Sequence, residues 1–376
     1  MNTQKPEKIA IIGSSIAGLA SAIGCARHGY EVHIFGQVPK DLPGGIQLAP
    51  NGFQALASLG LLEQAKKLMM DLSAIEIRSM RTNALLAEIH HEDGTLNKRD
   101  YASMRRADLI HLMQDTLGHF PGVQFHDHEV TSLHQTDDKI TLCLDNGKDR
   151  DFDFAIGADG RNGLSRQIVA GRSEHNLTDY VALRAVAHKD DLPANFQTKR
   201  TQLWLGDGAH IVHYPLASDE INLVICLARP RTTPQEAIKS IARNSAILNG
   251  LCNSQISWHM TELPSAELLP VWRKQRLMLI GDAAHFMPPH LAQGAGQTLQ
   301  DAASLSDILS REGDLLSHAK LWAASRRQEL VPIVRRADDT GAIMRLKGPL
   351  ARLRNFAIDV GGSKMIESWL NEVWRD

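Results

Sequence analysis

Residues 276–302 have the sequence RLMLIGDAAHFMPPHLAQGAGQTLQDA. The apolar run LMLI near its start predicts a buried strand that ends at Gly281-Asp282. A turn of small residues, 294–296, then opens a helical pattern. Open α/β sheets bind ligands at such strand ends, and the unpaired N–H groups and dipole of a helix start favour a negative group. The stretch therefore predicts a ligand site built from a carboxylate and a helix N-terminus.

The amino terminus repeats the pattern of strand, turn and helix. The apolar run KIAII, residues 8–12, leads into a glycine turn and a helix of small residues that reaches about Arg27, and a second strand covers 32–35. This order predicts a βαβ dinucleotide-binding unit, with Ser15 in place of the middle glycine. The predicted cofactor contacts in this turn are Gly13, Ser15, Ile16, Ala17 and Gly18.

Composition limits the class of protein. The chain has 376 residues, is 43% hydrophobic and 22% charged, and carries a net charge of −2, which indicates a globular protein with an ample core. A balance so near neutral gives no electrostatic case for nucleic acid or an anionic membrane surface. The 4 cysteines form no CxxC pair, which indicates a reducing compartment. Without a signal peptide or an apolar run of about 18 residues, we expect a cytoplasmic protein with no membrane span.

Three motifs in a fixed order resemble one family. The segments GDAAH at 281–285 and QGAG at 293–296 are similar to the second FAD signature of the single-component aromatic hydroxylases, the group A flavoprotein monooxygenases. The segments RADL at 106–109 and ADG at 158–160 resemble two further motifs of that family. The resemblance implies FAD as cofactor. It also implies NADH or NADPH as a transient reductant, since the sequence shows no second nucleotide-binding βαβ unit.

The resemblance assigns roles to single residues. It implies that Asp282 binds the ribityl chain and that the N–H groups of Ala295 and Gly296 face the flavin pyrimidine edge. It places Arg106 beside the flavin and Asp159 near the pyrophosphate. The remaining predicted contacts are Gln47, Pro289 and Gly294.

One position departs from the family pattern. The family places a Glu at the end of the second strand, where it holds the ribose hydroxyls, and this chain has Gly36 followed by Gln37. A backbone group or a neutral side chain must then make that contact. The departure predicts weaker FAD binding than is usual in the family.

The segments between the FAD motifs have a different pattern. Short alternating runs predict an antiparallel sheet, and in the family such a sheet carries the substrate pocket. The predicted fold is therefore α/β: a GxGxxG-type, Rossmann-like FAD domain with an inserted antiparallel β-sheet substrate domain and C-terminal helices, resembling the para-hydroxybenzoate hydroxylase type. The predicted segments are 1–70, 100–175 and 270–345 for the FAD domain, 72–99 and 178–268 for the substrate domain, and 346–376 for the closing helices.

The run HIVHYPL, residues 210–216, is the predicted substrate strand. Alternation on a strand places His210 and Tyr214 on one face and His213 on the other. This spacing resembles the pocket strand of 3-hydroxybenzoate 6-hydroxylase and 6-hydroxynicotinate 3-monooxygenase. A phenol that loses its proton becomes a better nucleophile toward a flavin C4a-hydroperoxide, and a His of near-neutral pKa can take that proton. We expect His210 as base or orienter, Tyr214 as hydrogen-bond partner and His290 as a second pocket residue.

The implied function is an NAD(P)H- and O2-dependent FAD monooxygenase that hydroxylates a phenolic or N-heteroaromatic small molecule. No unambiguous Arg clamp for a carboxylate stands out in the substrate strand, which leaves a larger lipophilic quinone or quinolone open. Gly36 leaves open a degenerate flavoprotein that binds aromatics without turnover. No metal site is predicted, and the chain is expected to be a monomer or a homodimer. A long helical stretch after 315 carries Arg326, Arg327, Arg335 and Arg336, which are expected on a solvated basic face.

Overall fold

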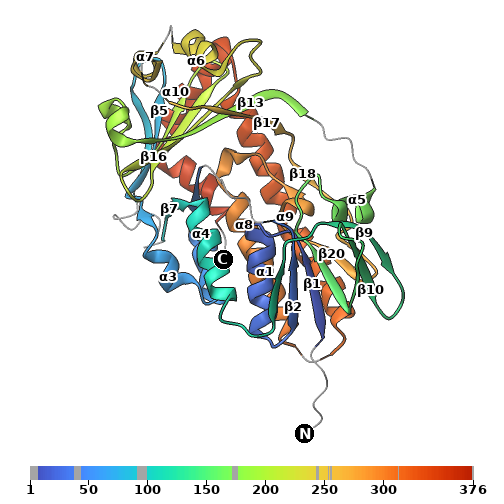
Figure 1. Cartoon of the computed structure of the whole chain (residues 1–376). Helices are drawn as coiled ribbons and strands as arrows, with labels where there is room; N and C mark the ends of the chain where they lie inside the picture. Colours follow the sequence, from blue (N-terminus) through green and yellow to red (C-terminus); the bar gives the residue numbers. More distant parts are fainter. Residues whose placement is uncertain are drawn as a thin grey trace.

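The computed structural model describes residues 7–37, 44–90, 100–171, 177–242, 245–252, 254, 256–311 and 313–374 (Figure 1). Residues 91–99 of the predicted substrate-domain segment 72–99 therefore lie outside the described residues. Within the described residues, no helix combines the length and the apolar character that crossing a membrane requires.

A parallel sheet forms the first half of the molecule. Its strands lie in the order β19-β20-β12-β1-β2-β8, and every neighbouring pair is parallel except β19 with β20. The strands are short apolar runs because both faces of the sheet are covered. Their bounds are β1 (Lys8–Ile12), β2 (Glu31–Phe35), β8 (Val123–His126), β12 (Phe154–Gly157), β19 (Arg273–Lys274) and β20 (Leu277–Leu279).

Alternate residues of β1 belong to two different cores. Ile9 and Ile11 pack against the helical layer, whereas Ala10 and Ile12 pack against a small three-stranded sheet on the other face. The parallel sheet is thus the middle of three layers (Figure 1). The helical layer contains α1 (Ile16–Arg27), α4 (Arg106–Leu117) and α8 (Gly294–Leu309), and the small sheet contains β9 (Val130–Gln135), β10 (Ile140–Leu144) and β11 (Asp149–Phe152).

A seven-stranded sheet forms the second half of the molecule and lies at the top of Figure 1. Its order is β17-β13-β16-β15-β14-β5-β6, antiparallel throughout except for the parallel pair β14 and β5. Described strands from segments 72–99 and 178–268 thus share one sheet, while the division into domains stays a prediction. The bounds are β5 (Ala74–Ser79), β6 (Leu85–His90), β13 (Leu177–His188), β14 (Thr201–Leu205), β15 (His210–Pro215), β16 (Glu220–Ala228) and β17 (His259–Pro264).

The two faces of this sheet have different neighbours. One face packs with α6 (Pro234–Ala242) and α7 (Ala246–Cys252) in a separate apolar core. His213 lies on that face, with its ring 4.7 Å from Phe196 and 6.3 Å from Trp204 between centroids. The opposite face, which we call the His210 face, carries His210 and Tyr214, as the alternation predicts.

Two long helices and several short elements complete the fold. The helix α9 packs on α8, and the Trp322 Nε1–H donates to Ser304 Oγ at 2.9 Å. The helix α10 runs along β6, the edge strand of the seven-stranded sheet. The bounds of these and of the connecting elements are α9 (Leu315–Met344), α10 (Gly348–Asn371), β3 (Gly45–Leu48), β4 (Met70–Asp71), β7 (Ala102–Arg105), β18 (Glu267–Leu268), β21 (His285–Phe286), α2 (Pro50–Ser58), α3 (Leu62–Lys66) and α5 (Leu164–Ala170).

The buried position of His213 predicts that this residue contributes to the loss of folding stability at acidic pH. Both ring nitrogens are buried without a partner among the described residues, and burial lowers the pKa of His213 to about 3. Between pH 6.5 and 3 the unfolded chain therefore binds one more proton at this site than the folded chain, so this contribution to stability is lost as the pH falls. From pH 7 to pH 5 we expect His213→Phe to lose about 2 kcal/mol less unfolding free energy than the wild type, as measured by urea denaturation.

The matched control for this prediction is His119→Gln, because His119 is exposed. That variant should show the pH dependence of the wild type. Equal pH dependence in His213→Phe and wild type would contradict the buried, neutral state of His213.

Candidate active site

Four strand ends meet at one edge of the parallel sheet. Gly13 follows β1, Gly36 follows β2, Asp159 follows β12 by two residues and Asp282 follows β20. Because these strands are parallel neighbours, the residues that follow them lie at the same edge. The sequence-predicted contacts from three separate segments are thus brought together.

The turn after β1 needs its glycines for close packing. Gly13 has φ +109°, and a Cβ there would lie 2.5 Å from the carbonyl oxygen of Ala158. A Cβ on Gly18 would lie 1.9 Å from the carbonyl oxygen of Gly13. The helix α1 therefore starts against the strand edge, with exposed Ser15 as its N-cap and no side-chain cap bond. The N–H groups of its first turn have no intrahelical acceptor, which suits a phosphate.

A buried carboxylate supports the turn that carries Asp282. Oδ2 of Asp301 accepts hydrogen bonds from the Gly281 N–H at 2.9 Å and from Nε2–H of His285 at 2.6 Å. Its Oδ1 accepts from Arg326 Nε–H at 2.8 Å. Burial raises the pKa of Asp301, but His285 and Arg326 outweigh burial and lower it. The ionised carboxylate thereby ties β20 and its turn to α8 and α9.

The expected solvated position of Arg326 is wrong. Its side chain is 5% exposed, and Nη2 donates to the backbone oxygen and the Oε1 of Gln297 in addition to the bond with Asp301. The helical period turns Arg326 toward the same core as Trp322 and Leu330. Arg335 is solvated as predicted, with an exposed fraction of 83%. Arg327 and Arg336 are only partly exposed: Arg327 Nε donates to the backbone oxygen of Leu269 at 2.9 Å, and the Arg336 guanidinium lies 3.9 Å from the ring centroid of Trp369.

The first turn of α8 is braced by side-chain amides. Asn51 Nδ2 of α2 donates to Gln293 Oε1 at 2.9 Å and to Gln300 Oε1 at 3.0 Å. The Cα of Gly296 lies against α2, where a Cβ on Gly52 would be 3.7 Å from it. Gly294 and Ala295 open the helix, and their N–H groups have no intrahelical acceptor. This arrangement fits the predicted contact with a negatively charged ring edge. The remaining predicted residue of this segment, Pro289, begins the short 3-10 helix η4 (Pro289–Leu291).

Two arginines lie near the Asp282 carboxylate. Asp282 is accessible but has protein on most sides, and this reduced hydration raises its pKa, while His285, Arg106 and Arg161 act in the opposite direction. Arg106 is the predicted one and is exposed at the start of α4. Arg161 was missed, although it directly follows the predicted ADG turn. Its guanidinium lies 5.2 Å from the ring centroid of Phe286, and its buried Nη1 has no partner among the described residues.

Two predicted cofactor contacts have partners within the protein. Asp159 Oδ2 accepts from the Ser165 N–H at 2.9 Å, at the start of α5. The side-chain amide of Gln47 is buried and donates to Tyr101 Oη at 2.7 Å and to Thr201 Oγ1 at 2.5 Å. Cofactor roles for Asp159 and Gln47 stay predictions, as do those of Gly36 and of exposed Gln37.

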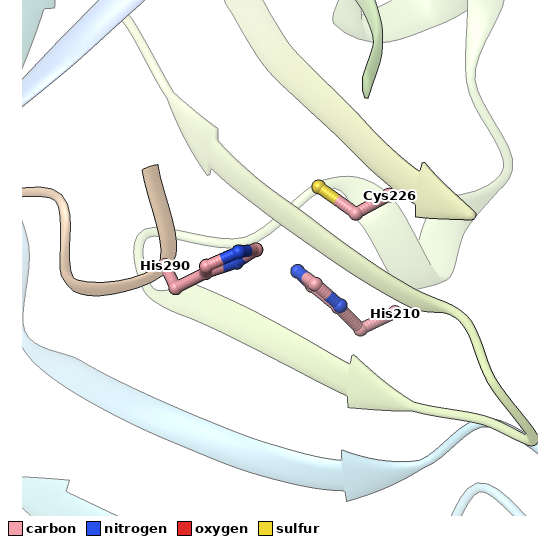
Figure 2. A group of neighbouring side chains, drawn as sticks. All are labelled: His210, Cys226 and His290. Carbon is pink, nitrogen blue, oxygen red and sulfur yellow. The ribbon is translucent and has the colours of Figure 1, made fainter. Parts of the chain in front are cut away.

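The His210 face carries two of the three predicted pocket residues, His210 and Tyr214, and the third, His290, packs against His210. The rings of His210 and His290 are 5.4 Å apart between centroids, in a T-shaped arrangement, and Figure 2 shows them on either side of one space. His290 comes from η4. Its ring packs on α9, where a Cβ on Gly341 would lie 2.5 Å from His290 Cδ2. The ring of Tyr214 packs on the backbone of Gly45, where a Cβ would lie 2.9 Å from its Cε2.

Both histidines of this face are neutral at pH 7. Burial lowers the pKa of His210 well below its usual range, and the charges of His290, Arg354 and Arg345 act in the same direction. Burial and Arg345 lower the pKa of His290 to about 4. The expected near-neutral pKa is thus absent from both residues. Nδ1 of His210 and both ring nitrogens of His290 are buried without a partner among the described residues, so they are available to a ligand.

Two further arginines of this region were missed by the sequence analysis. Arg184 on β13 is the cross-strand partner of Val224, which in turn pairs with Val212 between His210 and Tyr214. Arg184 therefore shares their face, and its Nε donates to Thr261 Oγ1 at 3.3 Å. Arg345, at the end of α9, acts on the pKa of both histidines. The apolar run VALRAVA, residues 181–187, contains a single Arg, and this pattern could have indicated Arg184. The position of Arg345 depends on the tertiary fold.

Sequence comparison identifies a protein family and several relatives that align over most of their own length. A family model described as FAD binding domain matches residues 7–313. A 3-amino-4-hydroxybenzoate 2-monooxygenase of Streptomyces platensis is 28% identical over 98% of this chain and 96% of its own. The 3-hydroxybenzoate 6-hydroxylase of Klebsiella oxytoca is 28% identical over 92% of this chain and 90% of its own. The 6-hydroxynicotinate 3-monooxygenase of Bordetella bronchiseptica is 27% identical over 89% of this chain and 92% of its own.

Solved structures share the whole fold. The Klebsiella pneumoniae protein HpxO, in a variant complexed with FAD, matches with a TM-score of 0.87 at 20% identity over 98% of both chains. A likeness at this identity establishes the fold alone. The predicted α/β fold is confirmed.

The hydrogen bonds and ion pair of Asp301 predict that a single conservative substitution there lowers the free energy of unfolding strongly. Asp301→Asn keeps the shape of the side chain but removes the buried counter-charge of Arg326 and leaves only the exposed Glu329 paired with it. Removing one partner of a buried ion pair costs about 3–5 kcal/mol of unfolding free energy. We expect that loss in urea denaturation, together with weaker FAD retention, because the Asp282 turn loses its support.

The control is Glu329→Gln, which removes the exposed partner of Arg326. It should change the unfolding free energy by less than about 1 kcal/mol, as exposed ion pairs do. An Asp301→Asn protein with the stability and FAD affinity of the wild type would contradict the supporting role of this carboxylate.

Proposed function

The chain belongs to the FAD-binding domain family, and we propose that it is an FAD-dependent monooxygenase. The proposed enzyme uses O2 and NADH or NADPH to hydroxylate a phenolic or N-heteroaromatic small molecule. Relatives that align with nearly the whole chain are named monooxygenases and hydroxylases of hydroxybenzoates and hydroxynicotinate, and this confirms the predicted class of enzyme. The nicotinamide reductant, a cytoplasmic location and a monomeric or homodimeric state belong to the proposal.

The helix N-termini and side chains at the strand edge complement the charged and polar groups of FAD. The diphosphate suits the first turn of α1, where Gly13 allows close approach of the backbone. Asp282, within the influence of Arg106 and Arg161, suits the ribityl hydroxyls. The first N–H groups of α8 suit the electron-rich edge of the flavin ring. When bound, FAD supplies the oxygen chemistry, and the protein supplies binding, orientation and electrostatics.

The observation that carries the proposal is the pair of neutral histidines with unpartnered ring nitrogens on the His210 face. A phenolic O–H or a ring nitrogen of a substrate satisfies such groups. His210 accepts the phenolic proton, and the arriving negative charge offsets the burial that lowers its pKa. Burial raises the pKa of Tyr214, so its O–H stays protonated and donates a hydrogen bond to the developing oxyanion.

Two cations support an acidic substrate. Arg184 shares the face of Tyr214 and acts against the burial that raises the pKa of that residue, while Arg345 lies near His290. A carboxylate on the aromatic ring would compensate these charges. This favours small aromatic acids over the lipophilic quinone or quinolone substrates that the sequence left open.

The proposed function is tested with protein reconstituted with FAD. We expect 3-hydroxybenzoate or 6-hydroxynicotinate analogues to stimulate NADH or NADPH oxidation, with one oxygen atom added to the product by mass spectrometry. The corresponding methyl esters are the matched uncharged controls and should be poorer substrates. Tight binding of these acids without any nicotinamide oxidation would support the non-catalytic binding protein instead.

The role of His210 gives a separate prediction. His210→Ala should slow hydroxylation by about 100-fold or more, the usual range for loss of a general base. Its FAD affinity, followed by flavin fluorescence, should stay that of the wild type. His213→Phe on the same strand but the opposite face is the matched control, with little change in turnover. A His210→Ala protein that loses FAD would show that this residue belongs to the cofactor site.

A further inference from the structure

Three side chains with metal-binding atoms lie together on the His210 face. They are His210 from β15, Cys226 from β16 and His290 from η4, and Figure 2 shows the thiol and both imidazole rings around one space. One ligand atom of each residue lies within 4.8 Å of those of the other two. The three residues are far apart in the sequence, so their spacing predicted no metal site.

The fold holds these side chains in place from two sides. His210 and Cys226 are direct partners of an antiparallel pair, so their side chains emerge next to one another on the same face. His290 approaches from the opposite side on η4, which ends in left-handed Ala292 with φ +53°. The backbone of Gly341 lies directly behind the His290 ring, which prevents the ring from moving toward α9.

The donor atoms suit zinc. Two imidazole nitrogens and one thiolate sulfur are ligands of zinc sites, whereas calcium and magnesium prefer oxygen. The imidazoles are already neutral, and their buried nitrogens have no partner among the described residues. Burial raises the pKa of the Cys226 thiol to about 12, so without a metal this residue is an inert thiol.

We propose that His210, Cys226 and His290 form a zinc site whose occupation reversibly blocks substrate binding. On binding, the S–H bond of Cys226 breaks, its proton goes to solvent, and a sulfur–zinc bond forms. Three protein ligands leave the fourth position of the tetrahedral ion to water. The nearby positive charges of Arg345 and Arg354 oppose the cation, so the site is weaker than a four-ligand structural site.

Zinc binding rests on the geometry of the three residues alone. The block of turnover also rests on the proposed function, because that proposal places the substrate against His210 and His290. Binding and turnover are therefore measured separately.

The binding experiment uses the FAD-loaded full-length protein and zinc chloride in chelator-free buffer. Isothermal titration calorimetry should give one zinc per chain, and zinc-edge X-ray absorption should show sulfur and nitrogen neighbours. Cys226→Ala should weaken zinc binding at least tenfold. Cys226→Ser keeps the size of the side chain and should weaken zinc binding to the same extent. This variant tests the site if the alanine substitution destabilises the strand. Cys143→Ala, on β10 of the small sheet, is the control and should bind zinc like the wild type.

The turnover experiment measures hydroxylation with and without zinc. We expect zinc to raise the apparent KM for the aromatic substrate, and Cys226→Ala to keep the zinc-free rate while losing zinc sensitivity. Zinc binding that is unchanged in both Cys226 variants would overturn the site. Zinc bound through sulfur and nitrogen with no effect on turnover would overturn the block and place the substrate elsewhere. Absence of turnover without zinc would count against the proposed function and leaves the binding result valid.

Discussion

The buried carboxylate of Asp301 is the interaction on which the proposed site depends. A buried charge is costly unless it is paired and hydrogen-bonded, and Asp301 has three donors, from Gly281, His285 and Arg326. These donors belong to the turn after β20, to β21 and to α9, while Asp301 itself lies on α8. One side chain thus fixes the turn of Asp282 relative to the helix whose N-terminus faces the same edge.

The two halves of the molecule contribute different chemistry. The parallel sheet provides backbone N–H groups and Asp282 at its strand ends, which suit a nucleotide cofactor. The seven-stranded sheet provides neutral His210, a protonated Tyr214 and Arg184, and η4 and the end of α9 add neutral His290 and Arg345. These groups suit an acidic aromatic ring. Glycines without room for a Cβ make the close contacts, with Gly45 under Tyr214 and Gly341 behind His290. The absence of side chains at these positions lets the rings of Tyr214 and His290 pack directly on the backbone.

Local patterns predicted many of the strands and helices, whereas the prediction of the overall fold and of the site residues depended on the resemblance of the motifs. The short apolar strands followed by glycine turns predicted the βαβ start, and alternation separated His210 and Tyr214 from His213. The missed residues depend on pairing between distant segments. Arg184 joins the His210 face only through its register with β16, and Cys226 meets His290 only through the fold. Arg326 was assigned to solvent because its partner Asp301 lies on another helix.

We propose that the strand edge of the parallel sheet holds FAD. The most direct measurement is the absorbance spectrum of the purified protein after incubation with FAD and removal of free cofactor. We expect flavin bands at one FAD per chain, with Gly36 at the predicted ribose position weakening the affinity without abolishing it. A protein that stays colourless at saturating FAD would contradict FAD binding at this edge, because the turn glycines, Asp282 and the start of α8 would then lack the ligand for which their geometry is suited.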